Sequence, residues 1–175
     1  QAQIAPSLET ILNDSSVQLV AGAAVPSERC ALGLKVMDAG KDYFTDKAPL
    51  TTLEQLADAK AMVEKTGRKY AVYYSERLHV ESAVFAGQLV QQGAIGRVVQ
   101  TLGTGPHREG TGRPDWFYDR RYFGGILCDI GSHQIEQFLF YTGNSDAIVV
   151  ASQVRNVKHP QYRAFEDFGD AMLKG

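Results

Sequence analysis

Two short stretches of the chain contain residues suited to chemistry. One could supply a positive charge, and the other could transfer a proton. In "YFTDKAPLTTLEQ", Lys47 follows Asp46 and stands two residues before Pro49, where a loop leads from a short β-like run into a helix. In "GGILCDIGSHQIEQF", Asp129 and His133 are four residues apart, so on a helix they lie on one face. A histidine one turn from a carboxylate can act as a general base, and an ammonium group can neutralise developing negative charge.

Each of these groups also has a structural interpretation. Lys47 could be a solvated charge in a turn, and an isolated Asp/His pair is more often a surface ion pair or a core histidine with satisfied hydrogen bonds. His107, Asp129 and His133 are acceptable metal ligands, which leaves a metal-dependent isomerase or hydrolase open. Their spacing matches no zinc signature, so we assign no metal site. Cys128 has no identifiable base beside it and is expected to be a small buried hydrophobe.

A loop over residues 106–125 is rich in polar, aromatic and glycine residues. Such a loop suits a small molecule that carries hydroxyl or acid groups, although a solvated loop has a similar composition. The loop supplies the candidate substrate-binding residues His107, Arg113, Trp116 and Tyr118. The helix that carries Asp129 adds His133.

The order of elements before residue 75 predicts a parallel sheet. Strands expected at 17–24, 42–45 and 69–75 alternate with helices at 26–40 and 51–67, and the short links favour parallel pairing through right-handed crossovers. Ligands of such sheets bind beyond the carboxyl ends of the strands. The residues expected to share the apolar faces of the two helices are Cys30, Ala31, Leu34 and Met37 in the first, and Leu53, Leu56, Ala57 and Val63 in the second. The second helix has capping-box spacing at Thr51/Glu54 and Thr52/Gln55, and Gly67 is its expected end.

The second part of the chain has a different character. A helix is expected at 76–93, a strand at 96–105, a helix at 129–143, and long strands at 146–157 and 164–175. We therefore expect a partial Rossmann-like α/β domain at 1–75, followed at 76–175 by part of an α+β domain with a mainly antiparallel sheet.

Composition excludes several classes of function. The 175 residues carry a net charge of −2 without a basic or acidic block, so the sequence indicates neither nucleic-acid nor membrane-surface binding. No apolar run approaches the roughly 20 residues of a membrane span. With no secretion signal and two distant cysteines, Cys30 and Cys128, the expected location is the cytoplasm.

These motifs, in this order and over essentially the whole chain, resemble the Gfo/Idh/MocA family of NAD(P)-dependent oxidoreductases, which act on sugars, polyols and related compounds. The resemblance is carried by the lysine before a proline, "TGRKYAVYYSER", "GAIGRV" and "GGILCDIGSHQIEQFLFYTG". It implies NAD or NADP as cofactor, a small-molecule substrate, and a homo-oligomer formed through the sheet of the second domain.

The resemblance also implies roles for individual residues. Lys47 resembles the lysine of the family's Glu-Lys-Pro motif, between the nicotinamide ribose and the substrate, and Asp46 takes the place of the glutamate. Asp129 and His133 resemble the family's Asp-x-x-x-His pair, in which the histidine takes the proton of the substrate hydroxyl. With Lys47 they form the implied catalytic set. Arg77, with the backbone around Val25 and Pro26, is implied to flank the cofactor.

Two departures from the family pattern are visible. Ala48 stands between Lys47 and Pro49, which favours a second interpretation: a non-catalytic binding or assembly module that kept the fold. No G-x-G-x-x-G is present, since "GTGPHREG" follows a strand of the second domain and opens no helix. We therefore expect the pyrophosphate-binding unit to precede Gln1, and the chain to be a fragment that binds NAD(P) poorly and is inactive by itself.

Overall fold

The computed structural model describes residues 2–110 and 112–175. They form two compact units, of which the first ends at Tyr73 and the second begins at Tyr74. The expected fold class is confirmed, because the first unit holds a parallel sheet of three strands and the second an antiparallel pair. No helix within these described ranges has the length and apolar character to span a bilayer.

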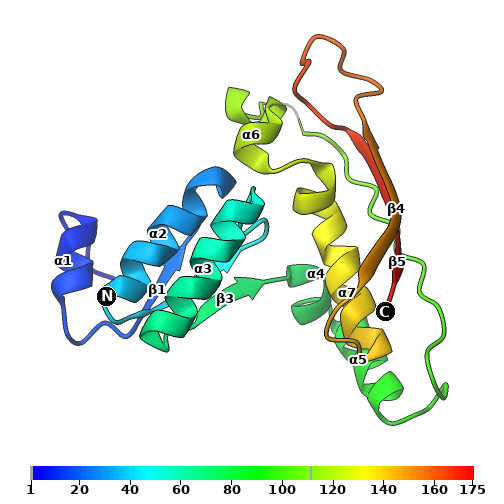
Figure 1. The fold of residues 1–175 in the computed structure, drawn as a ribbon, viewed down its shortest axis with the longest axis horizontal. Coiled ribbons are helices and arrows are strands. Elements are labelled where there is room, and N and C mark those ends of the chain that lie inside the picture. Colours follow the sequence, from blue (N-terminus) through cyan, green and yellow to red (C-terminus); the bar gives the residue numbers. More distant parts are fainter. Residues whose placement is uncertain (1, 111) are drawn as a thin grey trace. The chain divides into compact units, whose positions relative to one another are not determined.

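In the first unit, three strands and two of the helices form the βαβαβ arrangement that the sequence predicts. Strands β1, β2 and β3 lie in chain order and pair in parallel, so their carboxyl ends share one edge. Figure 1 shows α2 and α3 side by side on one face of this sheet. The elements are α1 (Leu8–Asn13), β1 (Leu19–Gly22), α2 (Pro26–Asp38), β2 (Asp42–Asp46), α3 (Leu53–Thr66) and β3 (Tyr70–Tyr73).

The core of this unit lies between α2 and the sheet. Val36 and Met37 of α2 and Tyr43 of β2 are fully buried there. Gly33 makes the close approach possible, because a Cβ atom at that position would lie 2.6 Å from the Tyr70 ring and 2.7 Å from the Tyr43 ring. This packing fixes α2 on the sheet, and because α2 follows β1, the helix begins at the carboxyl edge.

The predicted buried face of α2 is wrong in part. Cys30 and Met37 are buried, but Ala31 is exposed and Leu34 is only half-buried. The face that α2 turns inward contains a charged residue and a glycine, which apolar periodicity does not count. Its buried residues are Pro26, Arg29, Cys30, Gly33, Val36 and Met37.

Helix α3 begins and ends as predicted but buries a different face. The Oγ1 of Thr52 accepts a hydrogen bond from the Gln55 amide at 3.2 Å, and Gly67 ends the helix with a φ of 65°. Leu53 and Leu56, by contrast, are 79% and 42% exposed, so part of the predicted apolar stripe faces outward. Small Ala59 is buried instead, which lets the helix lie close to its neighbours.

The second unit is built from helices and one long hairpin. Strand β4 pairs with β5 in antiparallel register, from Ile148 opposite Lys174 to Arg155 opposite Phe168. Figure 1 shows α5 and α7 side by side in this unit. Its elements are α4 (Ser75–Leu78), α5 (Glu81–Gln91), the 3-10 turn η1 (Asp115–Tyr118), α6 (Arg120–Phe123), the π-helical turn η2 (Leu127–Gly131), α7 (Ser132–Thr142), β4 (Ile148–Arg155) and β5 (Phe168–Lys174).

Two predicted elements of this unit are wrong. The helix expected at 76–93 is two helices, because Val80 is extended and its carbonyl accepts from the amides of Ala83 and Val84 to begin α5. The expected strand at 96–105 does not form. Val99 and Leu102 are 81% and 87% exposed there, and an apolar run becomes a strand only when a neighbouring strand accepts its hydrogen bonds.

Candidate active site

The carboxyl edge of the parallel sheet carries four of the predicted site residues. The loop after β1 contains Val25, whose extended backbone (φ −52°, ψ 134°) immediately precedes α2, and buried Pro26 is the first residue of that helix. Helix α2 therefore begins at this edge, where the Glu28 amide donates to the Val25 carbonyl at 2.8 Å. Asp46 ends β2 and Lys47 begins the next loop, so both follow at the same edge.

The loop that carries Lys47 is held from within the first unit. Ala48 is fully buried, the peptide bond between Lys47 and Ala48 is cis, and the Tyr70 hydroxyl donates to the Pro49 carbonyl at 3.0 Å. Lys47 itself is half-buried and Asp46 is exposed. The inserted alanine is thus a packed part of the loop, and the lysine next to it lies only partly in solvent.

Arg29 is the functional candidate that the sequence analysis missed. Its side chain is 7% exposed, and its guanidinium donates to backbone carbonyls of both loops at the edge. Nε bonds to the Ala24 carbonyl at 2.8 Å, and Nη1 bonds to the carbonyls of Asp46 at 3.0 Å, of Ala48 at 3.1 Å, and of Lys47. The available signal was its spacing: Arg29 shares a face of α2 with Pro26 and Gly33.

In the second unit, Asp129 and His133 lie where the π-helical turn η2 meets α7. Asp129 is in η2 and His133 is in the first turn of α7, four residues later. A π-helical turn in such a position is frequently found at functional sites. His133 is 3% exposed, and the ring of Tyr74 meets it edge-on with centroids 6.0 Å apart. Burial raises the pKa of Tyr74, so this neighbour stays neutral.

Helix α4 is bonded to α7 through two consecutive residues. Arg77 forms an ion pair with Glu136, and one carboxylate oxygen of Glu76 accepts from Gln134 Nε2 at 3.1 Å and Gln137 Nε2 at 3.4 Å. The hydrogen bond to Glu136 raises the pKa of Arg77. The segment "YSER" therefore fixes the position of the helix that carries His133, and the predicted role of Arg77 at the cofactor stays a prediction.

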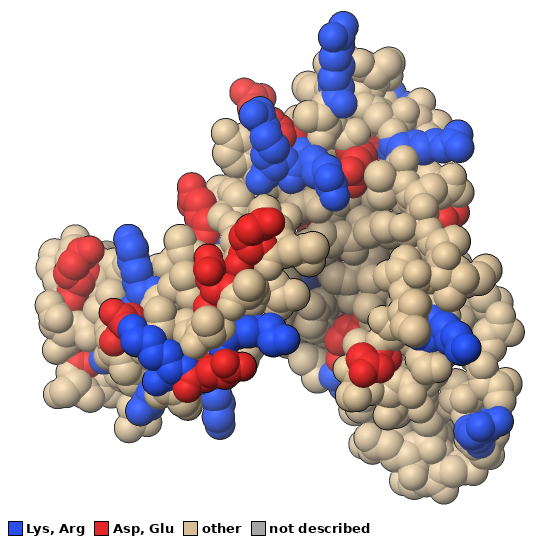
Figure 2. All heavy atoms as spheres, viewed as in Figure 1, with Lys and Arg blue, Asp and Glu red and all other residues tan. Residues whose placement is uncertain are grey.

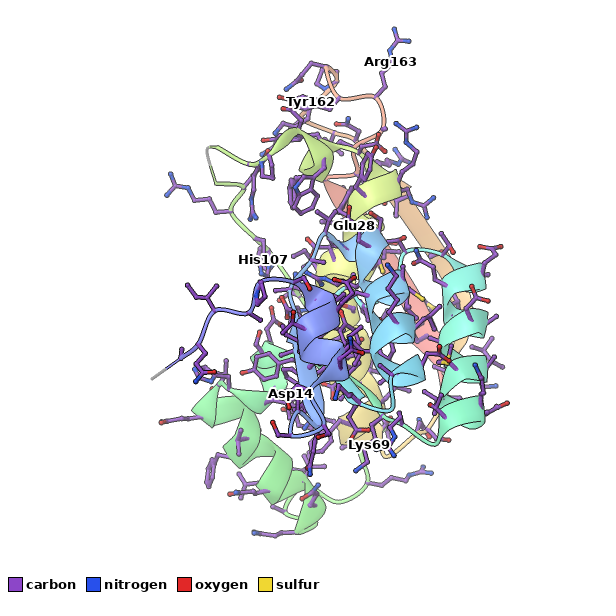
Figure 3. The ribbon with its side chains drawn as sticks, turned by 90° about the vertical axis from the view of Figure 1, so that its left-hand side faces the viewer. Asp14, Glu28, Lys69, His107, Tyr162 and Arg163 are labelled. Carbon is purple, nitrogen blue, oxygen red and sulfur yellow. The ribbon has the colours of Figure 1, made fainter. Side chains whose placement is uncertain are left out.

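The candidate substrate residues of the 106–125 loop are held mostly by aromatic contacts. His107 is exposed, with Nδ1 3.3 Å from the Gly105 carbonyl and Nε2 3.8 Å from Glu76. The Arg113 guanidinium lies 4.5 Å from the centroid of Phe117, against which Trp116 also packs. Tyr118 stacks on Tyr162, with ring centroids 4.0 Å apart and planes at 13°. Figure 3 shows Tyr162 in the connection between β4 and β5, with Arg163 beside it pointing into solvent.

A charged cluster anchors the same loop. His159 lies between two carboxylates, with Nε2 2.6 Å from Glu109 and Nδ1 2.8 Å from Asp167. Glu109 also accepts a hydrogen bond from Tyr118, which raises the pKa of that phenol. The loop is therefore tied to the β4–β5 connection at both its charged and its aromatic residues.

The geometry gives little support to the two alternatives, a metal site and a nucleic-acid interface. Among residues 2–110 and 112–175, no three His, Cys, Asp or Glu side chains gather as metal ligands, so His107, Asp129 and His133 do not form such a group. On the face in Figure 2, acidic and basic side chains are interspersed over the first unit, without the single-sign patch typical of nucleic-acid binding.

Comparison with known proteins places the chain in a family. The model of the GFO/IDH/MocA C-terminal domain matches residues 84–174, more than half of the chain. The chain belongs to the GFO/IDH/MocA family. The family expected from the sequence is thus confirmed.

Relatives of this GFO/IDH/MocA chain are oxidoreductases by name. A D-xylose dehydrogenase from Paenarthrobacter nicotinovorans is 28% identical over 138 residues, covering 75% of this chain and 35% of the dehydrogenase. A crystal structure from Erwinia carotovora atroseptica SCRI1043, of a protein assigned as an oxidoreductase, is 60% identical with a TM-score of 0.95, covering 98% of this chain and 51% of that one. The chain thus spans between about a third and half of these relatives' lengths.

A more distant structure shares the fold and was solved with a nucleotide. A protein of gentamicin A biosynthesis in complex with NAD has a TM-score of 0.74 at 21% identity, covering 98% of this chain and 48% of that one. At this identity the likeness shows the fold alone.

The carboxyl edge of the first unit carries an open apolar depression, and an apolar surface is compatible with the flat ring of a nicotinamide. Its lining residues are Ala21, Gly22, Ala23, Phe44, Asp46 and Tyr73. The Lys47 loop, which follows β2 at the same edge, adds polar groups beside it. For the pyrophosphate, the described residues offer no glycine-rich turn between a strand and a helix. The described residues therefore do not form a complete dinucleotide site.

Proposed function

We propose that this chain carries the reactive part of an NAD(P)-dependent oxidoreductase that acts on a hydroxyl group of a sugar, polyol or related small molecule. The observation that carries the proposal is the loop of Lys47, held at the carboxyl edge of a parallel sheet, in a member of the GFO/IDH/MocA family. The names of the relatives, among them D-xylose dehydrogenase and myo-inositol 2-dehydrogenase from Lactobacillus plantarum, support the substrate class.

The proposed reaction removes a hydride and a proton from a CH–OH group of the substrate. Bound NAD(P)+ supplies the acceptor for the hydride that leaves the carbon. An imidazole nitrogen of His133 takes the hydroxyl proton as the C–O bond becomes a carbonyl, and Asp129 supports the charged imidazolium. The Lys47 ammonium stabilises the negative charge that develops on the oxygen. In the reverse direction the same groups return the proton, and a carbonyl is reduced.

The remaining predicted residues have supporting roles in this proposal. Val25, Pro26, Asp46 and Arg77 contribute to holding the cofactor. His107, Arg113, Trp116 and Tyr118 contact the substrate's other polar groups.

Assembly and location complete the proposal. Many side chains of β4 are apolar and exposed, among them Ile148 at 70% and Val150 at 57%. An apolar, exposed strand pair of this kind supports the predicted homo-oligomer formed through the sheet. A cytoplasmic location stays a prediction.

The direct test is turnover by the product of the full gene. Reduction of NAD+ and NADP+ is followed at the nicotinamide absorbance band with a panel of aldoses and polyols that includes D-xylose and myo-inositol. His133→Ala is expected to lower kcat by about 10² to 10⁴, the usual contribution of a general base, while nucleotide affinity measured by calorimetry stays unchanged. The matched control is His79→Ala, because His79 is exposed at the end of α4.

Three outcomes would overturn parts of this proposal. Full turnover in His133→Ala would remove the role assigned to that residue. Nucleotide binding without turnover on any of the panel would favour the non-catalytic module. Loss of turnover on dialysis against a chelator, restored by a divalent metal, would favour the metal-dependent alternative.

A further inference from the structure

Two buried cations in the first unit are held by backbone carbonyls at opposite ends of the sheet. Lys41, 4% exposed, donates to the carbonyls of Asp14 at 2.7 Å and Val17 at 2.8 Å, just before the start of β1. Arg29, 7% exposed, donates to the loops that follow β1 and β2. The pair offers a built-in comparison, because only Arg29 lies at the edge that carries Lys47.

The guanidinium of Arg29 joins the loop that follows β1 to the loop that follows β2. Its Nε donates to the Ala24 carbonyl, two residues before α2 begins. Its Nη1 lies within hydrogen-bonding distance of three consecutive carbonyls, those of Asp46, Lys47 and Ala48, which share its two N–H groups. Arg29 therefore holds the peptide groups on both sides of the Lys47 Cα. This fixes the backbone position from which the lysine side chain extends.

The chemistry of arginine explains why this residue type stands at the position. A buried charge is costly unless hydrogen bonds satisfy it, and a buried carbonyl also costs free energy when it has no donor. A planar guanidinium presents several donors in a rigid fork, whereas a lysine ammonium is a compact group on a flexible stem. A neutral side chain of similar size would fill the space but leave the Ala48 carbonyl, in a fully buried residue, without this donor.

We propose that Arg29 is a positioning residue for Lys47: its contacts with the carbonyls of residues 24 and 46–48 set the place from which the lysine ammonium acts. This inference rests on the proposed function of Lys47. It goes beyond that function because it makes a residue on α2 responsible for the position of the lysine. Arg29 acts through Lys47 and needs no contact with substrate or cofactor.

The test is a double-mutant cycle in the full-length enzyme, with kcat and KM measured for its best substrate. Lys47→Met is expected to lower kcat by about 10² to 10³. Arg29→Met is expected to lower kcat by about 10², the cost of misplacing a reacting group by about 1 Å, and to change KM by less than about threefold. Because Arg29 acts through Lys47, the double variant is expected to have the kcat of Lys47→Met alone.

Two further variants separate positioning from folding. Lys41→Met removes the buried cation at the other end of the sheet, so it is expected to lower the thermal midpoint while kcat of the folded enzyme stays that of the wild type. Arg29→Lys keeps the charge and loses the fork, and it is expected to lower kcat by about tenfold with a near-native thermal midpoint. If Arg29→Met does not fold, the kcat of Arg29→Lys tests the positioning role instead.

The outcomes distinguish this inference from the function on which it rests. Wild-type kcat in Lys47→Met would refute the proposed role of the lysine. A loss in Lys47→Met together with wild-type kcat in Arg29→Lys and Arg29→Met would refute only the positioning role. Losses that multiply in the double variant would also refute it, because they would show that Arg29 acts independently of Lys47.

Discussion

Arg77 and Glu136 form a bidentate ion pair between α4 and α7. Arg77 Nε lies 2.7 and 2.8 Å from the two carboxylate oxygens, and the guanidinium carbon is 4.0 Å from the centroid of the Phe140 ring. The two side chains are 19% and 20% exposed, so the pair is largely shielded from solvent. Since His133 lies one turn before Glu136 on the same helix, this pair also limits how α7 can rotate.

We expect Glu136→Gln to destabilise the second unit by about 1 to 2 kcal/mol, because a hydrogen-bonded, shielded ion pair contributes more than an exposed one. Urea unfolding of the 175-residue chain, followed by the fluorescence of its sole tryptophan, Trp116, measures the change. The control is Asp170→Asn in the same unit, which changes an exposed carboxylate that accepts a hydrogen bond from Gln153. A larger loss in the control than in Glu136→Gln would contradict the interpretation.

The stack of Tyr118 on Tyr162 leads to a prediction about substrate affinity. Tyr162→Ala removes the ring against which Tyr118 lies, so the loop with Arg113 and Trp116 loses an anchor. An aromatic pair contributes about 0.5 to 1.5 kcal/mol, and we therefore expect KM to rise up to about tenfold with kcat nearly unchanged. Steady-state kinetics of the full-length enzyme measure both.

Tyr162→Phe is the matched variant for this experiment, because it keeps the ring and the stack. Its KM should equal that of the wild type. A similar rise in KM for Tyr162→Phe and Tyr162→Ala would show that the hydroxyl, and not the stack, matters. An unchanged KM in both would remove the loop from substrate binding.

Asp167 predicts how the second unit responds to acid. Burial alone would raise the pKa of this carboxyl, but hydrogen bonds from the amides of Val157 and Lys158 and from His159 outweigh burial and lower it below its ordinary value of 3.8. A group whose pKa is lower in the folded than in the unfolded state stabilises the fold above the unfolded pKa. That contribution is lost as the pH falls below about 4 and the folded carboxyl takes up its proton.

We therefore expect the free energy of unfolding of the wild type to fall between about pH 5 and pH 3, and that of Asp167→Asn to fall less over the same range. At pH 7 the variant should be less stable by about 1 to 3 kcal/mol, because the hydrogen bonds to a charged acceptor are weakened. Urea unfolding at several pH values measures both effects. Asp170→Asn, which changes an exposed carboxylate of β5, is the control and should keep the acid response of the wild type.

The sequence predicted local features best where one residue type fixes the backbone. Thr52 and Gly67 bound α3 as expected, and Gly143 ends α7 in the left-handed conformation. These signals are local, because a cap needs only its own helix. The family and the fold class were also readable, since motif order and the alternation of strands and helices are properties of the chain alone.

Several of the predictions that failed depended on a neighbouring segment. Whether 96–105 forms a strand depends on a second strand to pair with, and which face of α2 is buried depends on how closely Gly33 lets it approach the sheet. The role of Arg29 depends on carbonyls 17 to 19 residues away in the chain. The apolar periodicity of a segment does not indicate which distant residues it will contact.

The sequence by itself determined the family, the parallel βαβαβ order and the identity of Lys47, Asp129 and His133 as candidates, because these follow from residue types and spacing. Only the tertiary structure decided that Arg29 holds the Lys47 loop, that Glu136 and the amide side chains of α7 bind α4, and that Tyr118 belongs to an aromatic stack. The physical reason is that a hydrogen bond or a ring contact between distant segments exists only when the fold brings its two partners within a few ångströms of each other.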